Sequence, residues 1–457
     1  MSPTTGTPGV GPGQLWDAPL AQGPLDAMVE VPGSKSLNSR YLILAALADR
    51  PVTIRGALRS RDSSLMIDAL RTFGARVDDA GDDWTVTPPS RLAGGGFIDC
   101  GLAGTVMRFA PPLTLLADAP VSFDGDLGAR DRPMRPMIDA LRALGATVDD
   151  AGSGALPFTV APPSQIAAEV AIDASMSSQF VSGLLLVAAR LPNGLTIRHV
   201  GATLPSIPHI DMTCEVLRGA GVEVLRPDER TWTVVPGPIH LTDVRVEPDL
   251  SNAGPFIAAA LVAGGTVRIP HWPAETTQPG AFYPELLRKM GATCTLADGV
   301  MSVTGTGIIH GIDADLSPAG EITPTIAALC AFADGPSNLM GIGHLRGHET
   351  DRLAALATEI RRIGGRCDEG PASLHIWPPS DGPLHAADIQ TYHDHRMATF
   401  AAIVGLRVPG TRVINVGTTA KTMPGFPEMW CDMLGVADPC APAPDTHNPD
   451  AFNTGAS

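Results

Sequence analysis

The six residues LRTFGA at positions 70–75 set the pattern on which the chain is built. Close variants stand at 141–146 (LRALGA), 217–222 (LRGAGV), 287–292 (LRKMGA) and 360–365 (IRRIGG), and a worn sixth copy ends at position 435. The glycines of these copies, at positions 74, 145, 221, 291, 364 and 435, are separated by 71, 76, 70, 73 and 71 residues. Spacing this regular identifies an internal repeat, which has to be recognised before any single motif is interpreted.

Each copy of the repeat is surrounded by the same signals. A helix is predicted to begin at Asp62, Pro136, Pro284 or Thr350, to carry apolar residues at helical spacing and to end at the repeated glycine. That glycine fits the position after a helix, which often needs a positive φ. A strand follows, as at 85–87, 158–160 and 232–234, and each copy leaves room for a second helix, for example over 178–189.

The repeats predict an α/β protein of six units, too long for a solenoid and too similar for unrelated domains. Two domains of three units each, facing a cleft, are the economical arrangement, with a boundary near 246–248, after the third copy. The Gly/Pro/Thr-rich residues 1–13 and the Pro/Asp/Asn-rich residues 438–457 are predicted to be disordered tails.

The composition argues against several classes of function. With 44% hydrophobic and 18% charged residues the chain resembles a globular protein, and its formal charge of −16 opposes nonspecific binding to nucleic acid or to an anionic membrane. The seven cysteines form no C-x-x-C, which favours reduced thiols over disulfides or zinc. No signal peptide and no long apolar run are found. We therefore expect a cytoplasmic protein.

The stretch 31–40, VPGSKSLNSR, combines a Pro-Gly turn with Lys35, flanking serines and Arg40. Lys35 is one of only three lysines in a chain that otherwise uses Arg. A Lys retained in a Gly/Ser turn favours a compact charge beside backbone amides, and thus an anion-binding turn. It is not a Walker loop, because Ser34 stands where that motif needs glycine. The alternative is an ordinary surface turn.

Further polar or glycine-rich stretches interrupt the repeat pattern. In the first half they are 101–108 (GLAGTVMR), 129–133 (ARDRP) and 175–180 (SMSSQF), the last of which is either a phosphate-binding helix start or a plain N-cap. In the second half, Glu321 lies within 319–324 (AGEITP), and Lys421 lies within 419–422 (TAKT). The stretch 348–352 (HETDR) opens the fifth repeat helix, either as an anion site or as a capping arrangement.

The stretch 392–397 (YHDHRM) raises the question of a metal, because His393 and His395 are predicted to share one face of a strand. A zinc site needs three or four protein ligands, and no further Cys/His cluster stands near, so we expect no metal. Taken together, the motifs predict a basic cage and two acids, Glu321 and Glu349, for proton transfer on multiply anionic metabolites without a cofactor. The basic residues are Lys35, Arg40, Arg132, Arg352, Arg396 and Lys421.

These motifs, in this order, resemble those of the 5-enolpyruvylshikimate-3-phosphate (EPSP) synthases. The shared patterns are P-G-S-K-S-x-x-x-R, A-G-T-x-M-R, R-D-R-P, S-S-Q-F, H-E-T-D-R-L, D-H-R-M-A and T-A-K-T, and they extend from about Pro32 to Pro427. The resemblance implies the two-domain enolpyruvyl transferase fold, an inverse α/β barrel with three βαβαββ units per domain. It also implies an N-terminal domain of residues 33–247 and a discontinuous C-terminal domain of residues 14–32 plus 248–437.

The implied reaction transfers the enolpyruvyl group of phosphoenolpyruvate to the 5-hydroxyl of shikimate 3-phosphate, on the route to chorismate and the aromatic amino acids. By resemblance, Glu321 accepts the hydroxyl proton and Glu349 protonates the methylene carbon, with Lys35 also catalytic. Shikimate 3-phosphate is expected at Lys35, Ser36, Arg40, Ser177, Ser178, Gln179, Ser206, Glu321 and His348. Phosphoenolpyruvate, with which glyphosate should compete, is expected at Lys35, Gly104, Arg132, Gln179, Arg352, Arg396 and Lys421.

Several positions depart from the pattern most frequent in this family. Glu321 replaces an Asp, His344 and His348 stand where Asn and Lys contact shikimate 3-phosphate, and a pH dependence near neutrality from His348 is one expected consequence. Leu102 and Phe109 replace Asn and Pro, and His209 replaces a Tyr.

Two alternative functions remain. One is the sister transferase that acts on UDP-N-acetylglucosamine, whose mobile loop carries a Cys that is missing around 132–133. The other is a non-catalytic protein that binds phosphorylated metabolites. We expect a monomer whose domains close on the substrates.

Overall fold

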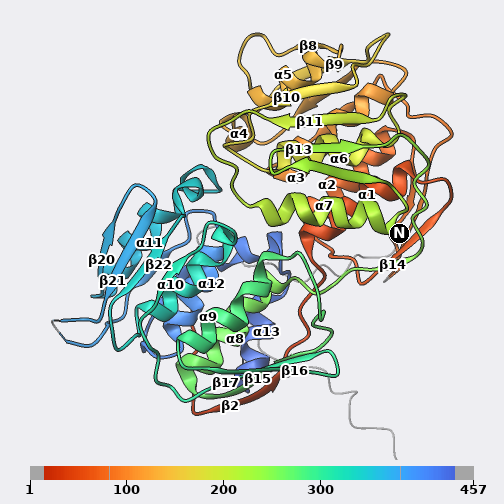
Figure 1. Ribbon diagram of the computed structural model, residues 1–457. Coiled ribbons are helices and arrows are strands. Elements are labelled where there is room, and N and C mark those ends of the chain that lie inside the picture. Colours follow the sequence, from red (N-terminus) through yellow and green to blue (C-terminus); the bar gives the residue numbers. More distant parts are fainter. Residues whose placement is uncertain (1–14, 82, 381, 438–457) are drawn as a thin grey trace, which may run out of the picture.

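The computed structural model describes residues 15–81, 83–380 and 382–437, and the predicted tails 1–13 and 438–457 lie outside these residues. Helices and strands follow one another in a recurring order, and the described chain forms two lobes, as Figure 1 shows. One hydrophobic core gathers side chains between Leu37 and Val246. A second core combines Trp16 to Val29 with Leu250 to Met433. None of the described helices has the length and apolar character that a membrane span requires.

The first lobe holds the first three units. The first unit consists of α1 (Lys35–Leu47), β3 (Val52–Arg55), α2 (Arg61–Thr72), β4 (Arg76–Asp78), β5 (Trp84–Thr87) and β14 (Val244–Arg245). The second consists of β6 (Phe97–Asp99), α3 (Gly104–Phe109), η1 (Pro111–Leu116), β7 (Val121–Asp124), α4 (Leu127–Arg130), α5 (Arg135–Ala143), β8 (Thr147–Asp149) and β9 (Phe158–Ala161). The third consists of β10 (Glu169–Ile172), α6 (Gln179–Ala188), β11 (Leu195–His199), α7 (Ile207–Gly219), β12 (Val224–Asp228) and β13 (Thr231–Val234).

The second lobe holds the other three. The fourth unit consists of β2 (Leu25–Met28), α8 (Leu250–Ala263), β15 (Gly265–Ile269), η2 (Pro279–Phe282), α9 (Tyr283–Lys289), β16 (Thr293–Ala297) and β17 (Val300–Gly305). The fifth consists of β18 (Asp313–Asp315), η3 (Gly320–Ile322), α10 (Thr323–Cys330), β19 (Ser337–Met340), η4 (Gly343–Gly347), α11 (Arg352–Arg362), β20 (Arg366–Glu369) and β21 (Ser373–Trp377). The sixth consists of β22 (Asp388–Gln390), α12 (His395–Gly405), β23 (Arg412–Ile414), η5 (Val416–Lys421), α13 (Phe426–Leu434) and β1 (Leu15–Asp17).

Five units share one sheet order. In the second unit the strands lie in the order β6-β7-β9-β8, with β6 parallel to β7 and the other pairs antiparallel. Four-stranded sheets of the same pattern occur in the first, third, fourth and fifth units, and the sixth has three strands, β1-β23-β22. The predicted sixfold α/β repeat is therefore confirmed. Among the described residues the strands pair into separate sheets, and no closed barrel of strands is formed.

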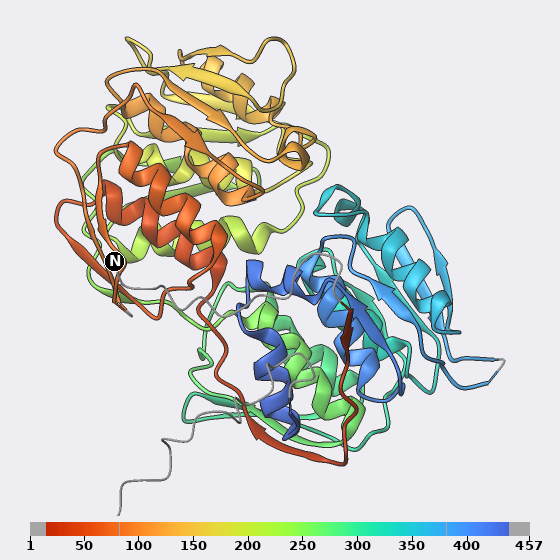
Figure 2. The same ribbon diagram turned by 180° about the vertical axis from the view of Figure 1, so that it is seen from behind.

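Three sheets are completed by strands from far along the chain. Strand β14 pairs with β3 in the first lobe, with Val244 opposite Ile54. In the second lobe β2 pairs with β15, and β1 pairs with β23, where Trp16 lies opposite Val413. Figure 2 shows β1, in dark red, among the blue elements of the second lobe. The N-terminal strands thus belong to the lobe formed by the C-terminal half.

The repeated glycines adopt the conformation that the sequence predicted. All six lie just after a helix with positive φ, at 91°, 102°, 79°, 101°, 85° and 66° in chain order. This region of φ is costly for residues with a Cβ, so glycine is favoured where these helices end.

The three central helices of the first lobe all begin beside the space between the lobes. In the first lobe α1, α3 and α6 contact one another, and in the second lobe α8, α10 and α12 do so. Lys35, Gly104 and Gln179 are the first residues of the three helices in the first lobe, and all three line the space between the lobes. The repeat therefore brings equivalent helix starts of different units together at one site.

The chain crosses between the lobes through two adjacent segments, at 32–34 and 247–249. The Ser34 amide donates to the Glu247 carbonyl at 2.7 Å, and the Asp249 amide donates to the Pro32 carbonyl at 2.8 Å. The position of this crossing and the two separate cores support the expected division at about 32 and 248, which itself stays a prediction.

Candidate active site

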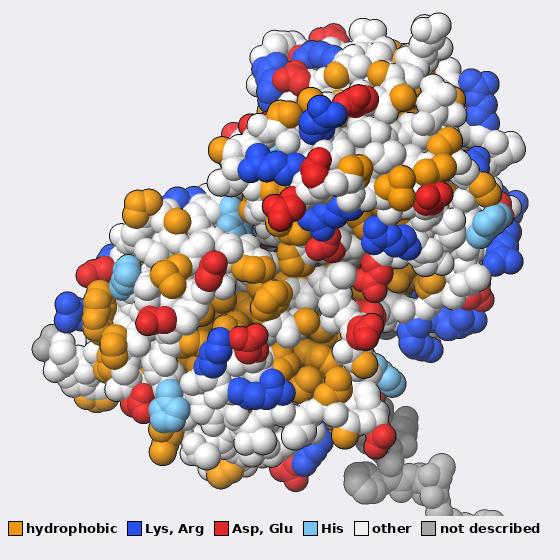
Figure 3. All heavy atoms as spheres, in the orientation of Figure 1, with side chains coloured by type: hydrophobic (Ala, Val, Ile, Leu, Met, Phe, Trp, Pro, Cys, Tyr) orange, Lys and Arg blue, Asp and Glu red, His pale blue; other side chains and the backbone are white. Residues whose placement is uncertain are grey.

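One cleft between the lobes brings together almost every residue that the sequence singled out. It is lined by all the predicted site residues except Arg40, namely Lys35, Ser36, Gly104, Arg132, Ser177, Ser178, Gln179, Ser206, Glu321, His348, Glu349, Arg352, Arg396 and Lys421. The sequence motifs did not propose Thr105, Arg108, Met176, Pro205, Gly347 and His395 as ligand-binding residues, although these also line the cleft. Figure 3 shows the two lobes as separate masses, with charges of both signs interspersed on the face in view.

Lys35 is positioned by the start of α1. The Ser34 hydroxyl caps this helix by accepting from the Leu37 amide, and the Lys35 amide donates to Asp249 Oδ2 of the second lobe at 3.2 Å. Lys35 Nζ lies 3.7 Å from Oδ2 of the buried Asp62. The stretch 31–40 is therefore a helix start at the cleft. Asp62 was not predicted as a partner of Lys35, because an acid in the first turn of a helix is equally typical of a helix start.

Arg40 lies behind the cleft surface, which differs from its expected direct contact with substrate. Its side chain is fully buried, and its guanidinium donates to the Ser36 carbonyl, to the Thr213 hydroxyl and to the His209 carbonyl, each at 2.8 Å. Burial lowers the pKa of Arg40 to about 9, so the group keeps its charge at neutral pH. In this structure Arg40 holds together the backbone of α1 and α7 rather than lining the cleft.

The remaining residues of the first lobe lie around Gly104. A Cβ at this position would lie only 2.8 Å from Arg108 Nη1, with Gln179 Oε1 and Arg132 Nη1 at 3.7 Å and 3.8 Å, so the absence of a side chain leaves room for the Arg108 guanidinium beside these two residues. The Arg132 guanidinium donates to the Leu102 carbonyl at 3.0 Å. Ser206 precedes α7 with a left-handed backbone, φ 53°, which turns the chain into the cleft.

In the second lobe Glu349 is surrounded by cationic and imidazole groups. Its Oε1 atom accepts from Lys421 Nζ at 2.6 Å, and its Oε2 atom lies 3.0 Å from His395 Nδ1. Burial alone would raise the pKa of Glu349, but His395 and Lys421 outweigh burial and hold it well below its usual value. Burial lowers the pKa of Lys421, although Glu349 opposes that shift. At neutral pH the carboxyl is therefore ionised.

Arg352 begins α11 and pairs with Asp394, at 2.7 Å between Nε and Oδ2, with both side chains buried. Asp351 caps this helix by accepting from the Ala354 amide, so the helix begins two residues after the predicted Thr350. The stretch 348–352 thus combines both interpretations that the sequence left open, a cap at Asp351 and an Arg at the cleft.

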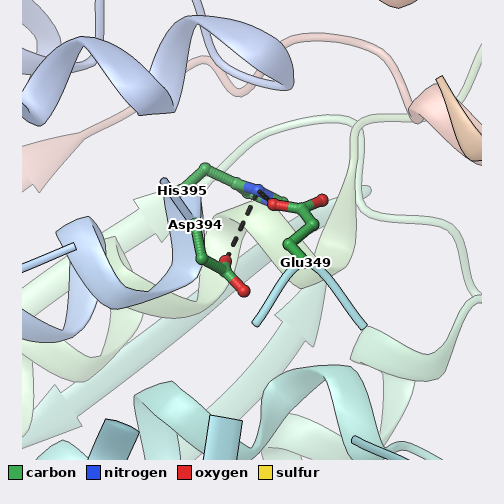
Figure 4. A group of neighbouring side chains, drawn as sticks. All are labelled: Glu349, Asp394 and His395. Carbon is green, nitrogen blue, oxygen red and sulfur yellow. Dashed lines mark hydrogen bonds and ion pairs between the residues drawn. The ribbon is translucent and has the colours of Figure 1, made fainter. Parts of the chain in front are cut away.

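The structure corrects the expectation for His393 and His395. His395 is the first residue of α12, and His393 lies in the preceding turn with φ 58°, so the two do not share a strand face. Figure 4 shows Glu349, Asp394 and His395 close together. Within the described residues, they are the one group of three or more His, Cys, Asp or Glu side chains whose potential metal-binding atoms all lie within 4.8 Å of one another. Their carboxylates already pair with Lys421 and Arg352, which compete with a metal ion.

Glu321 lies on η3, opposite the first lobe. Its Oε1 atom accepts from Ser251 Oγ at 2.7 Å, and its Oε2 atom lies 3.3 Å from Nε2 of His209 on α7. Arg396 Nη2 is 3.7 Å from Oε1. Burial would raise the pKa of Glu321, but these neighbours lower it to about 2. Glu321 is thus a carboxylate held by groups from both lobes.

His348 does not fit the expected titration near neutral pH. Burial, followed by the charge of Arg352 and the nearby His344, holds the pKa of His348 well below 6.5. Its Nδ1 atom lies 3.3 Å from Arg352 Nη1. His348 is therefore neutral at neutral pH in this state, and so is His344, whose pKa burial also lowers.

Comparison with known proteins agrees with this geometry. The family model described as EPSP synthase (3-phosphoshikimate 1-carboxyvinyltransferase) matches residues 20–430. The chain belongs to the EPSP synthase family. Its relatives include the 3-phosphoshikimate 1-carboxyvinyltransferase of Bifidobacterium longum, 55% identical over 92% of this chain and 98% of the relative. The enzyme of the same name from Kocuria rhizophila is 54% identical over 92% of this chain and 97% of the relative.

Solved structures share the fold of this family. An EPSP synthase from Acinetobacter baumannii superposes with a TM-score of 0.77 at 23% identity, covering 93% of this chain and 99% of that one. The enolpyruvyl transferase NikO from Streptomyces tendae gives a TM-score of 0.69 at 18% identity, covering 92% and 98%. The enolpyruvyl transferase fold expected from the motifs is thus confirmed.

Proposed function

We propose that this protein transfers the enolpyruvyl group of phosphoenolpyruvate to the 5-hydroxyl of shikimate 3-phosphate and releases phosphate, a step towards chorismate in the shikimate pathway. The observation that carries the proposal is the cleft, in which Glu321 and Glu349 face basic side chains from both lobes. Relatives with more than half of their residues identical are named for this reaction.

The cleft binds the anionic groups of both substrates. Phosphoenolpyruvate carries a phosphate and a carboxylate, which pair with Lys35, Arg132 and, from the second lobe, a further set of cations, Arg352, Arg396 and Lys421. The phosphate of shikimate 3-phosphate binds at the start of α6, where Ser177, Ser178 and Gln179 present hydroxyls and amides. Lys35 lies between the two sites.

Glu321 accepts the proton of the attacking hydroxyl. Its carboxylate is ionised, as a base must be, and a hydrogen bond from Ser251 of the second lobe and a contact with His209 of the first lobe fix its direction. As the hydroxyl proton leaves, the C–O bond forms to the central carbon of phosphoenolpyruvate.

Glu349 supplies the proton to the methylene carbon. It must first take up a proton, since Lys421 and His395 keep it ionised in the unliganded cleft. When Lys421 turns to the phosphate or carboxylate of the substrate, Glu349 loses a cationic partner and its pKa rises. The protonated acid then gives its proton to the methylene group, whose C=C bond opens as the new C–O bond forms. In the second step Glu349 takes a proton back from the resulting methyl group, the C=C bond forms again, and the C–O bond to phosphate breaks.

We further propose that the protein acts as a monomer in the cytoplasm. Both acids and all the cations of the cleft come from a single chain, so the site needs no second copy. The alternative functions, transfer to UDP-N-acetylglucosamine or binding without catalysis, are not favoured by any feature of the cleft.

The test of this mechanism separates binding from turnover. We expect Glu321→Gln and Glu349→Gln to bind shikimate 3-phosphate within about threefold of the wild type by calorimetry, while phosphate release slows by at least about a hundredfold. Glu285→Gln is the control, because Glu285 is exposed and pairs with Lys289 outside the cleft. Near-normal turnover in either cleft variant would show that the acid was assigned wrongly.

A further inference from the structure

The contact between His209 and Glu321 joins the two lobes across the cleft. His209 is on α7 of the first lobe and Glu321 is on η3 of the second, and Nε2 lies 3.3 Å from Oε2. The side chains are 10% and 17% exposed, so little water competes for either group. His209 is also one of the positions at which this chain departs from the frequent family pattern, as is Glu321.

The backbone of His209 is held firmly in place. Its carbonyl accepts hydrogen bonds from Arg40 Nη2 at 2.8 Å and from Thr213 Oγ1 at 2.9 Å. The Ser182 hydroxyl donates to the same carbonyl at 3.3 Å. Three donors on one carbonyl leave this turn of α7 little freedom, and the imidazole is therefore presented to the cleft from a rigid base.

The other oxygen of Glu321 is fixed from the second lobe. Ser251, on α8, donates to Oε1 at 2.7 Å, and Arg396, on α12, lies 3.7 Å from the same atom. The carboxylate is thus held at Oε1 by its own lobe and at Oε2 by the opposite lobe. The group that lies against the second oxygen, Oε2, is the imidazole of His209, through its Nε2 atom.

We propose that His209 is the positioning residue for the catalytic base Glu321, and that protonation of His209 weakens this base. The inference rests on the proposed function. With a neutral ring, Nε2 lies against Oε2 and limits the directions in which the carboxylate can point. With a charged ring, a full positive charge lies against the same oxygen, and the carboxylate becomes a poorer acceptor for the hydroxyl proton.

The surroundings keep the ring neutral at neutral pH. Burial is the largest influence lowering the pKa of His209, and the charges of Arg40, Arg396 and Lys35 act in the same direction, while Glu321 opposes them. His344, on η4, also interacts electrostatically with the ring. Protonation of the His209 ring therefore takes place below neutral pH, and at pH 7 and above the neutral ring supports catalysis.

The test compares two substitutions that differ in one respect. Gln at position 209 keeps a neutral polar side chain beside Glu321 but cannot titrate, whereas Ala removes the side chain from this contact. At pH 7.5 we expect His209→Gln to keep kcat within about threefold and His209→Ala to lower kcat by about tenfold or more, with KM for phosphoenolpyruvate changed by less than about threefold.

The pH profile distinguishes positioning from a structural role. As the pH falls from 7.5 to 5, wild-type kcat declines while His209→Gln is spared this titration, so the ratio of variant to wild-type kcat should rise as the pH falls. His344, His348 and His395 titrate in both proteins and cancel in the ratio. His240→Gln, which removes an exposed His paired with Asp49, is the control and should give a constant ratio.

The outcomes separate this inference from the proposed function. If the wild type releases no phosphate with shikimate 3-phosphate, the proposed function fails. If Glu321→Gln is inactive but His209→Ala keeps wild-type kcat, or the Gln ratio is constant with pH, only the role of His209 is overturned. Thermal unfolding of each variant checks the fold, and if the Ala variant is unfolded, the Gln ratio alone decides.

Discussion

At the scale of single residues, Glu349 shows how neighbouring charges in the cleft control the protonation of a carboxyl group. The residue proposed as proton donor is ionised before substrate arrives, because Lys421 and His395 lie 2.6 Å and 3.0 Å from its oxygens. An anionic substrate that attracts Lys421 removes one of these partners. On the proposed mechanism, binding and protonation are therefore coupled, and Glu349 becomes an acid only when substrate is bound.

This coupling predicts that ligand binding takes up protons. Removing a cation raises the pKa of the carboxyl, so binding glyphosate with shikimate 3-phosphate near pH 6.5 should draw protons from the buffer. Calorimetry in two buffers of different ionisation enthalpy measures the uptake. Lys421→Met should show less uptake, since Glu349 has already lost that partner. Heats that are independent of the buffer in the wild type would contradict the coupling.

At the scale of elements, close packing between α6 and α3 fixes the position of the residues around Gly104. Gly183, in α6, faces the backbone carbonyl of Arg108, and a Cβ there would overlap it. Because α3 begins at Gly104, displacing α3 disturbs the space beside Arg132. The glycine is therefore required by the distance between two helices rather than by an unusual φ.

Two glycine substitutions test this packing. Gly183→Ala should destabilise the protein by about 1–3 kcal/mol through overpacking. Gly219→Ala, in α7, is the matched control, since nothing lies within 4 Å of its added Cβ, and it should stay within about 0.5 kcal/mol of the wild type. Denaturant unfolding measures both. Equal stabilities for the two variants would show that the helices adjust freely.

Elements also show what the sequence could predict. The six glycines with positive φ were predictable because helix, glycine and strand are local neighbours. His393 and His395 were placed wrongly, because a left-handed turn at 392–393 interrupts the alternation that a strand requires. The contact of His209 with Glu321 joins residues more than a hundred positions apart, and no local signal announces such a pairing.

At the scale of the whole molecule, local sequence patterns again predicted more than contacts between distant residues could. The count of units followed from the repeat, and every predicted site residue except Arg40 lines the cleft. The burial of Arg40 did not follow, since its partners Thr213 and His209 come from another unit. The expected closure of the lobes on substrate remains a prediction.

The strands of the first lobe all come from one continuous segment of chain, whereas those of the second lobe come from two. Residues 33–247 contain every strand of the first three sheets, including β14, whereas residues 248–437 lack β1 and β2. We expect the fragment 33–247 to unfold cooperatively and the fragment 248–437 to lack a cooperative transition, because Trp16 and two strands are missing. Thermal unfolding followed by near-ultraviolet circular dichroism tests this. A cooperatively folded fragment 248–437 would contradict the predicted discontinuous domain.

The central claim is tested most directly by phosphate release from phosphoenolpyruvate with each of two acceptors, shikimate 3-phosphate and UDP-N-acetylglucosamine. We predict release that requires shikimate 3-phosphate and is competed by glyphosate. Release only with the sugar nucleotide would assign the protein to the sister activity. Tight binding of shikimate 3-phosphate without release would leave a binding protein on the same fold, and either result would contradict the proposed function.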